Sequence, residues 1–217
     1  MPANALMIPY PPGSNFASEI TESGPQSFQY FAVNASSGYG QSSARGAFDA
    51  DAITVWSPDY QVYQNATGDY DEDNTAPYKS DLQTSAYEPY TGQFHTLKGE
   101  WLDIKLPLEV LVSGYSLKVP SYSFKNSSWK LLMKLDYYES WVIMNSVENE
   151  DGWSASNGYE LYFPANNYGL TASKFRLVVT RNSGEAIPQV VELRLDAKQS
   201  YNTGKFFTDC ERGANVT

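Results

Sequence analysis

Cysteine, histidine and basic residues are scarce in this sequence, and each scarcity excludes a class of protein. Cys210 is the only cysteine in 217 residues, so no disulfide can form within the chain, and a small secreted scaffold held by disulfides is excluded. His95 is the only histidine, and one Cys with one His does not make a zinc ligand set. No Gly-x-Ser-x-Gly motif or comparable nucleophile context accompanies His95. We therefore expect a protein that is not an enzyme.

Positive charge is also low, with 15 Lys and Arg residues against 25 Asp and Glu residues and a formal net charge of −10. A field of this sign repels phosphate backbones and anionic lipid surfaces. Basic residues such as Arg45, Arg176 and Arg181 do not cluster along the sequence. We therefore expect no nucleic-acid partner.

Long apolar runs are absent too. None approaches the roughly 20 residues that span a bilayer, and the N-terminal MPANALMIPYPPGSNF lacks the basic and apolar regions of a secretory signal. These features predict a protein that is made in the cytoplasm, without a signal peptide and without membrane insertion.

Aromatic residues are abundant, with 17 Tyr, 10 Phe and 5 Trp, and such side chains favour strands and contact surfaces. The length suits one core with tails. We expect a proline-rich extended arm over residues 1–26, a β-sandwich over 27–197 and a polar tail over 198–217. In the arm, proline fixes φ and removes backbone donors, which disfavours a helix or a central strand.

Apolar side chains alternate with polar ones along several segments, which is the period of half-buried strands. Leu102, Ile104 and Leu106 alternate with polar or amphipathic residues until Pro107 interrupts the pattern. Four further segments predict inward-facing triplets in the same way: Tyr115, Leu117 and Val119; Trp129, Leu131 and Met133; Phe175, Leu177 and Val179; Val191, Leu193 and Leu195. No sustained helical stripe exists, so the pattern predicts an all-β, two-sheet sandwich with little helix.

The segment 57–94 differs from the rest because it is rich in Tyr and Asp and nearly free of aliphatic residues. It reads as a long loop inserted between strands, and loops of this length are either functional or poorly ordered. Its recurrent tyrosines favour a function, since disordered segments are usually poor in aromatics.

Five segments in order resemble the discoidin-like, or factor V/VIII type C, domains of the galactose-binding-like jelly rolls. They are SSARGAFDADAITVW, GEWLDIKLPLEVLVSGYSLKV, SSWKLLMKLDYYESWVIM, SKFRLVVTRNSG and VVELRLDA. The resemblance covers about residues 35–197 and implies a discoidin-like jelly-roll β-sandwich. Two features depart from the family pattern: MKLDYYESW replaces a glycine-containing turn, and the 57–94 insert is long. The family's ligand contacts therefore do not carry over directly.

The segment GEWLDIKLPLEV is similar to versions of this domain in structural proteins of large DNA viruses and in phage-type fibres. This similarity implies a minor capsid protein located in the virion, whose arm, insert and tail contact neighbouring capsid or assembly proteins. The alternative is a carbohydrate-binding adhesin or lectin module that recognises glycans through loop aromatics.

Four aromatic residues are candidates for ligand or partner binding. Trp153 lies in the polar segment EDGWSASNGY and is expected to be the most exposed tryptophan. Tyr60, Tyr63 and Tyr70 of the insert follow it. Contact with a partner protein and contact with a glycan both remain open for these residues.

Asp49, Asp51 and Thr54 lie within one short segment, and three oxygen-bearing side chains so close together can converge on a hard cation. The family resemblance implies a structural calcium ion here, with help from Glu192 in the last strand. The alternative is that Asp49 and Asp51 accept backbone N–H groups and cap turns.

Overall fold

The computed structural model describes residues 8–10, 32–37, 44–48, 53–58, 61–64, 67–121, 126–182 and 187–199. These residues form ten strands, linked by three short 3-10 turns, η2 (Ala44–Ala47), η3 (Lys79–Leu82) and η5 (Ala155–Asn157). The strands are β1 (Ile8–Tyr10), β2 (Ala32–Ala35), β3 (Gln83–Glu88), β4 (Gln93–Lys98), β5 (Trp101–Lys118), β6 (Asn126–Lys134), β7 (Trp141–Val147), β8 (Glu160–Pro164), β9 (Ala172–Asn182) and β10 (Glu192–Gln199). In this described part, no helical segment has the length and hydropathy to cross a bilayer.

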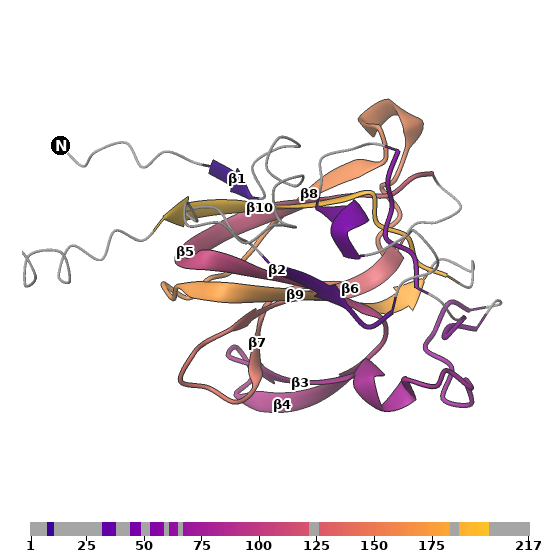
Figure 1. Cartoon of the computed structure of the whole chain (residues 1–217), viewed down its shortest axis with the longest axis horizontal. Helices are drawn as coiled ribbons and strands as arrows, with labels where there is room; N and C mark the ends of the chain where they lie inside the picture. The colour runs from indigo at the N-terminus through magenta and orange to yellow at the C-terminus, as the bar shows by residue number, and fades with distance from the viewer. Residues whose placement is uncertain are drawn as a thin grey trace, which may run out of the picture.

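Strand β5 belongs to both layers of the sandwich (Figure 1). Residues 101–105 pair with β9, and 102–105 also pair with β2, whereas 114–118 pair with β8 and β10. The β5–β9 pairing shifts between Lys105 and Val110, the stretch that contains Pro107, because proline has no N–H to offer the ladder. The sequence predicted that Pro107 ends the strand, and that prediction is wrong, because β5 continues to Lys118. The stretch around Pro107 is where the strand passes from one layer to the other.

The predicted inward-facing positions are confirmed, although Trp101, Asp103 and Leu132 on the other side of the same strands are buried as well. All fifteen inward-facing residues named from the sequence are 3% exposed or less, and most of them meet in one main core between the layers. Trp56 and Trp129 join the same core and are fully buried. The predicted all-β sandwich with little helix is therefore the observed architecture.

The segment 57–94 is not a long loop, and that prediction is wrong. It contains η3 and β3, and it reaches the first residues of β4, which pairs with β3 along its whole length. Strand β3 was missed because its buried positions are Thr84 and Ala86, which give no strong hydrophobic signal. Ala86 and Leu97 pack with Trp101 and neighbours in a second, smaller cluster outside the main core.

The insert is fixed to the sandwich by Tyr63. Its hydroxyl donates to the Val179 carbonyl (2.7 Å) and accepts the Glu100 N–H (2.9 Å). Gly99 lets these backbones approach, because a β-carbon there would lie 1.8 Å from the Val179 carbonyl oxygen. The insert is thus a packed cover, and the β3–β4 hairpin lies below β6 and β9 in the view of Figure 1.

The described part of the predicted arm is β1, which pairs with β10 at one edge of the sheet. Pro9 lies in this strand, and an edge strand is where proline is tolerated. The other residues of the arm and residues 200–217 of the tail lie outside the described residues.

Candidate functional site

The outer face of the layer formed by β8, β5 and β10 carries a small open hollow. Its volume is about 130 Å³, below the roughly 300–1,000 Å³ of pockets for drug-sized ligands, so it suits a group about the size of one ring. Its lining residues are Ser116, Tyr162, Arg194, Leu195 and Asp196.

The strand register explains why these side chains meet. Arg194 of β10 is opposite Ser116 of β5, and Ser116 is opposite Tyr162 of β8, so the three form one row across the face. In the next row on the same face, Asp196 is opposite Gly114. The face points outward because the alternate residues of β10, such as Leu193 and Leu195, are buried in the core.

Tyr162 is the most exposed residue that lines the hollow, with 57% of its area open to solvent. Its hydroxyl donates to the Asp196 carboxylate (3.2 Å) and lies directly over Gly114, where a β-carbon would be 2.0 Å away. Burial of the hydroxyl, followed by the negative charge of Asp196, raises the pKa of Tyr162. The phenol is therefore a neutral donor at physiological pH.

The hollow combines an exposed aromatic ring with a hydroxyl, a carboxylate and a guanidinium group. Asp196 accepts hydrogen bonds, Arg194 donates them and Ser116 can do both. An aromatic ring that is open on one side packs against C–H groups, while neighbouring polar groups fix the orientation of a ligand. This set of groups can hold a polyhydroxylated ring.

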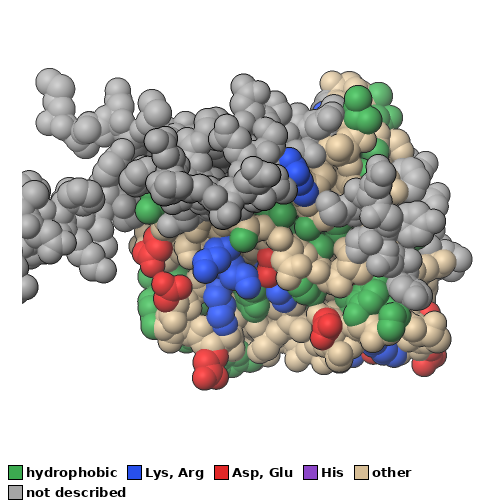
Figure 2. Space-filling view, in the orientation of Figure 1, with side chains coloured by type: hydrophobic (Ala, Val, Ile, Leu, Met, Phe, Trp, Pro, Cys, Tyr) green, Lys and Arg blue, Asp and Glu red, His purple; other side chains and the backbone are tan. Residues whose placement is uncertain are grey.

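The opposite outer face, formed by β9, β6 and the first part of β5, gathers positive charge. Figure 2 shows Lys and Arg side chains grouped where Figure 1 places β5 and β9. Lys105 is opposite Lys174, and Lys174 is opposite Lys134, so three lysines on adjacent strands form one row. We call these three residues the lysine row.

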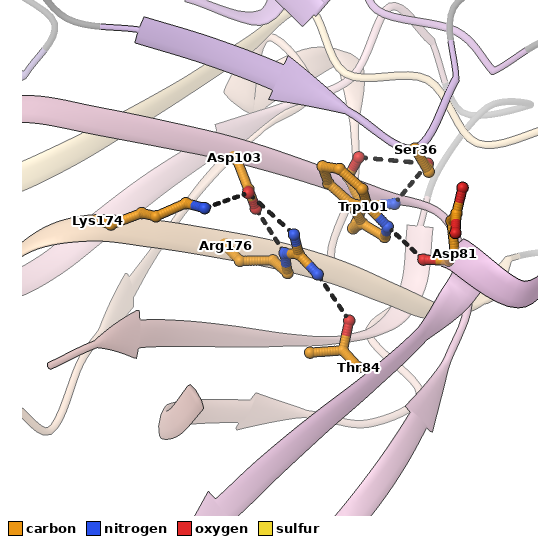
Figure 3. A network of polar contacts seen from close by, with 7 residues as sticks. All are labelled: Ser36, Asp81, Thr84, Trp101, Asp103, Lys174 and Arg176. Carbon is orange, nitrogen blue, oxygen red and sulfur yellow. Dashed lines mark hydrogen bonds and ion pairs between the residues drawn. The ribbon is translucent and has the colours of Figure 1, made fainter. Parts of the chain in front are cut away.

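Beside the lysine row, Arg176 and Asp103 form a two-pronged ion pair (Figure 3). Arg176 donates through Nε and Nη2 to the two Asp103 oxygens (2.5 and 2.9 Å) and through Nη1 to Thr84 (3.0 Å). Its guanidinium carbon lies 3.8 Å from the ring centre of Trp101 and 4.6 Å from that of Trp141. Asp103 is 3% exposed, so this pair joins β5, β9 and the β3–β4 hairpin and offers no free group to a ligand.

The expectation that Trp153 is exposed is wrong. Its side chain is 2% exposed and packs in the main core, with its ring centre 5.9 Å from that of Trp129. The surrounding segment is polar because it lies over the core with Asp151 and Gly152 outward, while Trp153 points inward. Trp153 therefore has no surface for stacking on a ligand.

The insert tyrosines do not form an exposed set. Tyr63 is 1% exposed and Tyr70 is half-buried, and an isolated bridge pairs their backbones. The expected exposure of Tyr63 is therefore wrong, since its hydroxyl is used to anchor the insert. Tyr60 lies outside the described residues.

Two members of the predicted calcium set, Thr54 and Glu192, lie within the described residues. The backbone pairing between their segments is an isolated antiparallel bridge of Trp56 with Val190. Thr54 is half-buried and Glu192 is buried, and a hydroxyl with a carboxylate fits a hard cation. Asp49 and Asp51 lie outside the described residues. Among the residues that are described, no cluster of three or more His, Cys, Asp or Glu side chains could hold a metal.

Sequence reasoning missed the Tyr162 hollow. Its residues come from three strands that are distant in sequence, and only the register of those strands brings them together. A weak signal was available: Arg194 is an outward residue of a recognised strand, and Tyr162 lies in an alternating segment. Neither position stands out without the pairing.

No family model and no curated protein matches this chain. Solved structures do match: CpGH89 from Clostridium perfringens, in complex with GlcNAc-α-1,4-galactose, has a TM-score of 0.53 and 17% identity. That match covers 79% of this chain but only 14% of the CpGH89 chain. The chain therefore spans a small part of the hydrolase, and the match is no evidence for catalysis.

Two smaller structures match over almost their whole length. The CBM32-5 module of CpGH89 from C. perfringens, in complex with GalNAc-β-1,3-galactose, has a TM-score of 0.50 and 12% identity, covering 76% of this chain and 94% of the module. The CBM32-3 module from a family 31 glycoside hydrolase of C. perfringens has a TM-score of 0.50 and 16% identity, covering 76% and 91%. These likenesses show the fold, a discoidin-like jelly-roll β-sandwich.

Proposed function

We propose that this chain is a non-catalytic carbohydrate-binding module whose binding site is the Tyr162 hollow. The observation that carries the proposal is the exposed Tyr162 ring with Ser116, Arg194 and Asp196 around it, in a hollow the size of one ring. The fold supports it as well, because one module of the same fold is in complex with GalNAc-β-1,3-galactose.

In this site the sugar ring packs its C–H face on Tyr162. Asp196 accepts hydrogen bonds from sugar hydroxyls, and Arg194 donates to sugar oxygens. Because the Tyr162 hydroxyl already donates a hydrogen bond to the Asp196 carboxylate, the ring and the carboxylate are held in place before the sugar binds. Holding both groups in advance lowers the entropic cost of binding.

Binding without hydrolysis is supported by the carboxylates of the hollow. Glycoside hydrolysis generally uses two carboxyl groups that flank the scissile bond. Among the described residues that line the hollow, Asp196 is the only carboxylate. Nearby Glu192 is 3% exposed and lies 3.4 Å from Arg194, so it does not face the sugar.

A glycan array tests the proposal. We expect selective binding to glycans with an exposed terminal sugar, reduced at least about tenfold in Tyr162→Ala, which corresponds to about 1.4 kcal/mol. The matched control is Tyr90→Ala, which removes a similar ring at another place. Tyr90 lies in the β3–β4 turn and is 93% exposed. Equal binding by wild type and Tyr162→Ala, or silence of wild type on the array, would contradict the proposal.

We also propose a structural calcium ion held by Thr54 and Glu192, with Asp49 and Asp51 completing the ligands. The ion would tie the 53–58 segment to β10, the strand that also carries Arg194 and Asp196. Protein purified with calcium should lose melting temperature on chelation, because an ion at 100 times its Kd adds about 2.7 kcal/mol. An unchanged melting temperature, or equal loss in Glu192→Gln, would discard the ion.

The virion hypothesis stays a prediction. It rests on the similarity of the segment GEWLDIKLPLEV to versions of this domain in viral structural proteins, and none of the comparisons supports a capsid role. Its proposed contacts with capsid proteins involve the arm, the 57–94 insert and the tail. Most residues of the arm and the tail lie outside the described residues.

A further inference from the structure

The lysine row opposes the charge of the whole molecule. Lys105, Lys174 and Lys134 face one another on three adjacent strands, about 5 Å apart from strand to strand, in a chain of net charge −10. Like charges directly opposite each other in a sheet destabilise it. A bound anion would therefore reduce the charge repulsion among the three lysines.

Asp103, the carboxylate that is paired with Lys174, does not neutralise the row. Both oxygens of Asp103 are taken by Arg176, and one of them is also 3.3 Å from Lys174. Among the described residues, no carboxylate lies within ion-pair distance of Lys105 or Lys134. Two of the three ammonium groups therefore remain available to an anion.

The pKa of Lys134 is lowered, first by partial burial and then by the charge of Lys174. The charge of Glu139 raises this pKa by more than the charge of Arg176 lowers it. An anion beside Lys134 would favour the protonated form and raise its pKa again. Lys134 is thus a cation whose neighbours leave room for a negative ligand.

Two exposed aromatic residues follow Lys134 in the sequence. Lys134 ends β6, and the turn that follows carries Tyr137 and Tyr138, which are 71% and 45% exposed, with ring centres 5.3 Å apart. Cations beside exposed rings fit a sugar that carries an acidic group, since the rings pack on its C–H face. A long polyanion such as nucleic acid would meet the repulsion of the net negative chain.

We infer that the lysine row binds the carboxylate or sulfate group of an acidic glycan, as a second site on the face opposite the Tyr162 hollow. The inference rests on the proposed carbohydrate-binding function and adds the charge class of the glycan. Lysine suits either group, because an ammonium is a point charge that demands no fixed geometry. The row and the hollow lie on different layers, so each can be tested by itself.

The experiment measures the Kd of three oligosaccharides at low salt by calorimetry: neutral galacto-oligosaccharide, oligogalacturonate and sulfated galactan oligosaccharide. We expect at least one acidic probe to bind tenfold or more tightly than the neutral one, with an advantage that salt screens. The acidic probe that binds more tightly than the neutral one identifies carboxylate or sulfate as the preferred group.

The variants separate the two sites. The double variant Lys105→Gln, Lys134→Gln should abolish the acidic advantage, whereas Lys98→Gln, the same change in a lysine paired with Glu72, should keep it. Melting temperatures confirm that the variants fold, and the double variant should be no less stable because it loses like-charge repulsion. Retention of the acidic advantage by the double variant would overturn the inference.

The neutral probe keeps the failures apart. If it binds through Tyr162 while neither acidic probe binds more tightly, the lysine row inference fails and the proposed function stands. If no probe of either class binds, both fail.

Discussion

The two outer faces of the sandwich share strand β5, yet they hold their polar groups in opposite ways. On one face Asp103 and Arg176 are paired, buried and enclosed by two tryptophan rings. On the other face Arg194 and Asp196 border an open hollow beside an exposed tyrosine. The closed pair holds β5, β9 and the β3–β4 hairpin together, whereas the open groups remain for a ligand.

The largest effect should come from an aromatic residue inside the core. Trp153→Ala should lower the free energy of unfolding by about 3–5 kcal/mol, because the side chain is 2% exposed and its loss leaves a cavity beside Trp129. Urea denaturation measures this. Tyr162→Ala, on the open face, is the matched control and should cost far less. A Trp153→Ala protein of normal stability that loses glycan binding would reverse the assignment of the two aromatics.

Next comes the buried ion pair. Asp103→Asn should cost about 3 kcal/mol, because Arg176 then keeps its charge in a buried place without a counter-charge. Asp196→Asn, the same change on the open face, should cost less than about 1 kcal/mol since solvent reaches that group. Equal losses in the two variants would remove the distinction between the faces.

A smaller change in stability, with a large change in binding, is expected for Gly114→Ala. The new β-carbon would lie 2.0 Å from the Tyr162 hydroxyl and 2.5 Å from the ring carbon Cζ, so the whole tyrosine ring must turn away. It would also lie 3.0 Å from the Phe163 carbonyl oxygen, which must shift by a few tenths of an ångström. Stability should therefore stay within about 1 kcal/mol, as for most surface changes, while glycan affinity falls at least about tenfold. Unchanged affinity would show that the position of Tyr162 is irrelevant to binding.

The smallest effect should be a gain. Lys134→Glu replaces a cation that faces Lys174 by an anion, and cross-strand charge pairs are worth about 0.2–1 kcal/mol. Its melting temperature should rise slightly, whereas Lys98→Glu, which breaks the pair with Glu72, should lower it or leave it unchanged. A lower melting temperature in Lys134→Glu would mean that the row carries no repulsion.

The sequence predicted the strands of the sandwich because burial on one side leaves a period-two pattern in a single strand. Leu102 and Ile104, or Leu193 and Leu195, reveal their direction without any knowledge of their neighbours. The five ordered segments also predicted the discoidin-like fold, which the solved modules share.

The candidate sites could not be predicted in the same way. Tyr162 meets Arg194 only through Ser116 of a strand between them, and Lys105 meets Lys134 only through Lys174. Such rows depend on the pairing of distant strands, which no local pattern records. The exposure of Trp153 was mispredicted for a related reason. Polar neighbours indicate that a segment lies at the surface, but they do not indicate the direction in which one ring points.

The most direct test of the central claim is a nuclear magnetic resonance map of the chain titrated with the neutral glycan that binds best. We expect the largest chemical-shift changes at Ser116, Tyr162, Arg194 and Asp196, and no change at Tyr63 and Trp153. Changes confined to other parts of the chain, with the Tyr162 hollow unaffected, would contradict it.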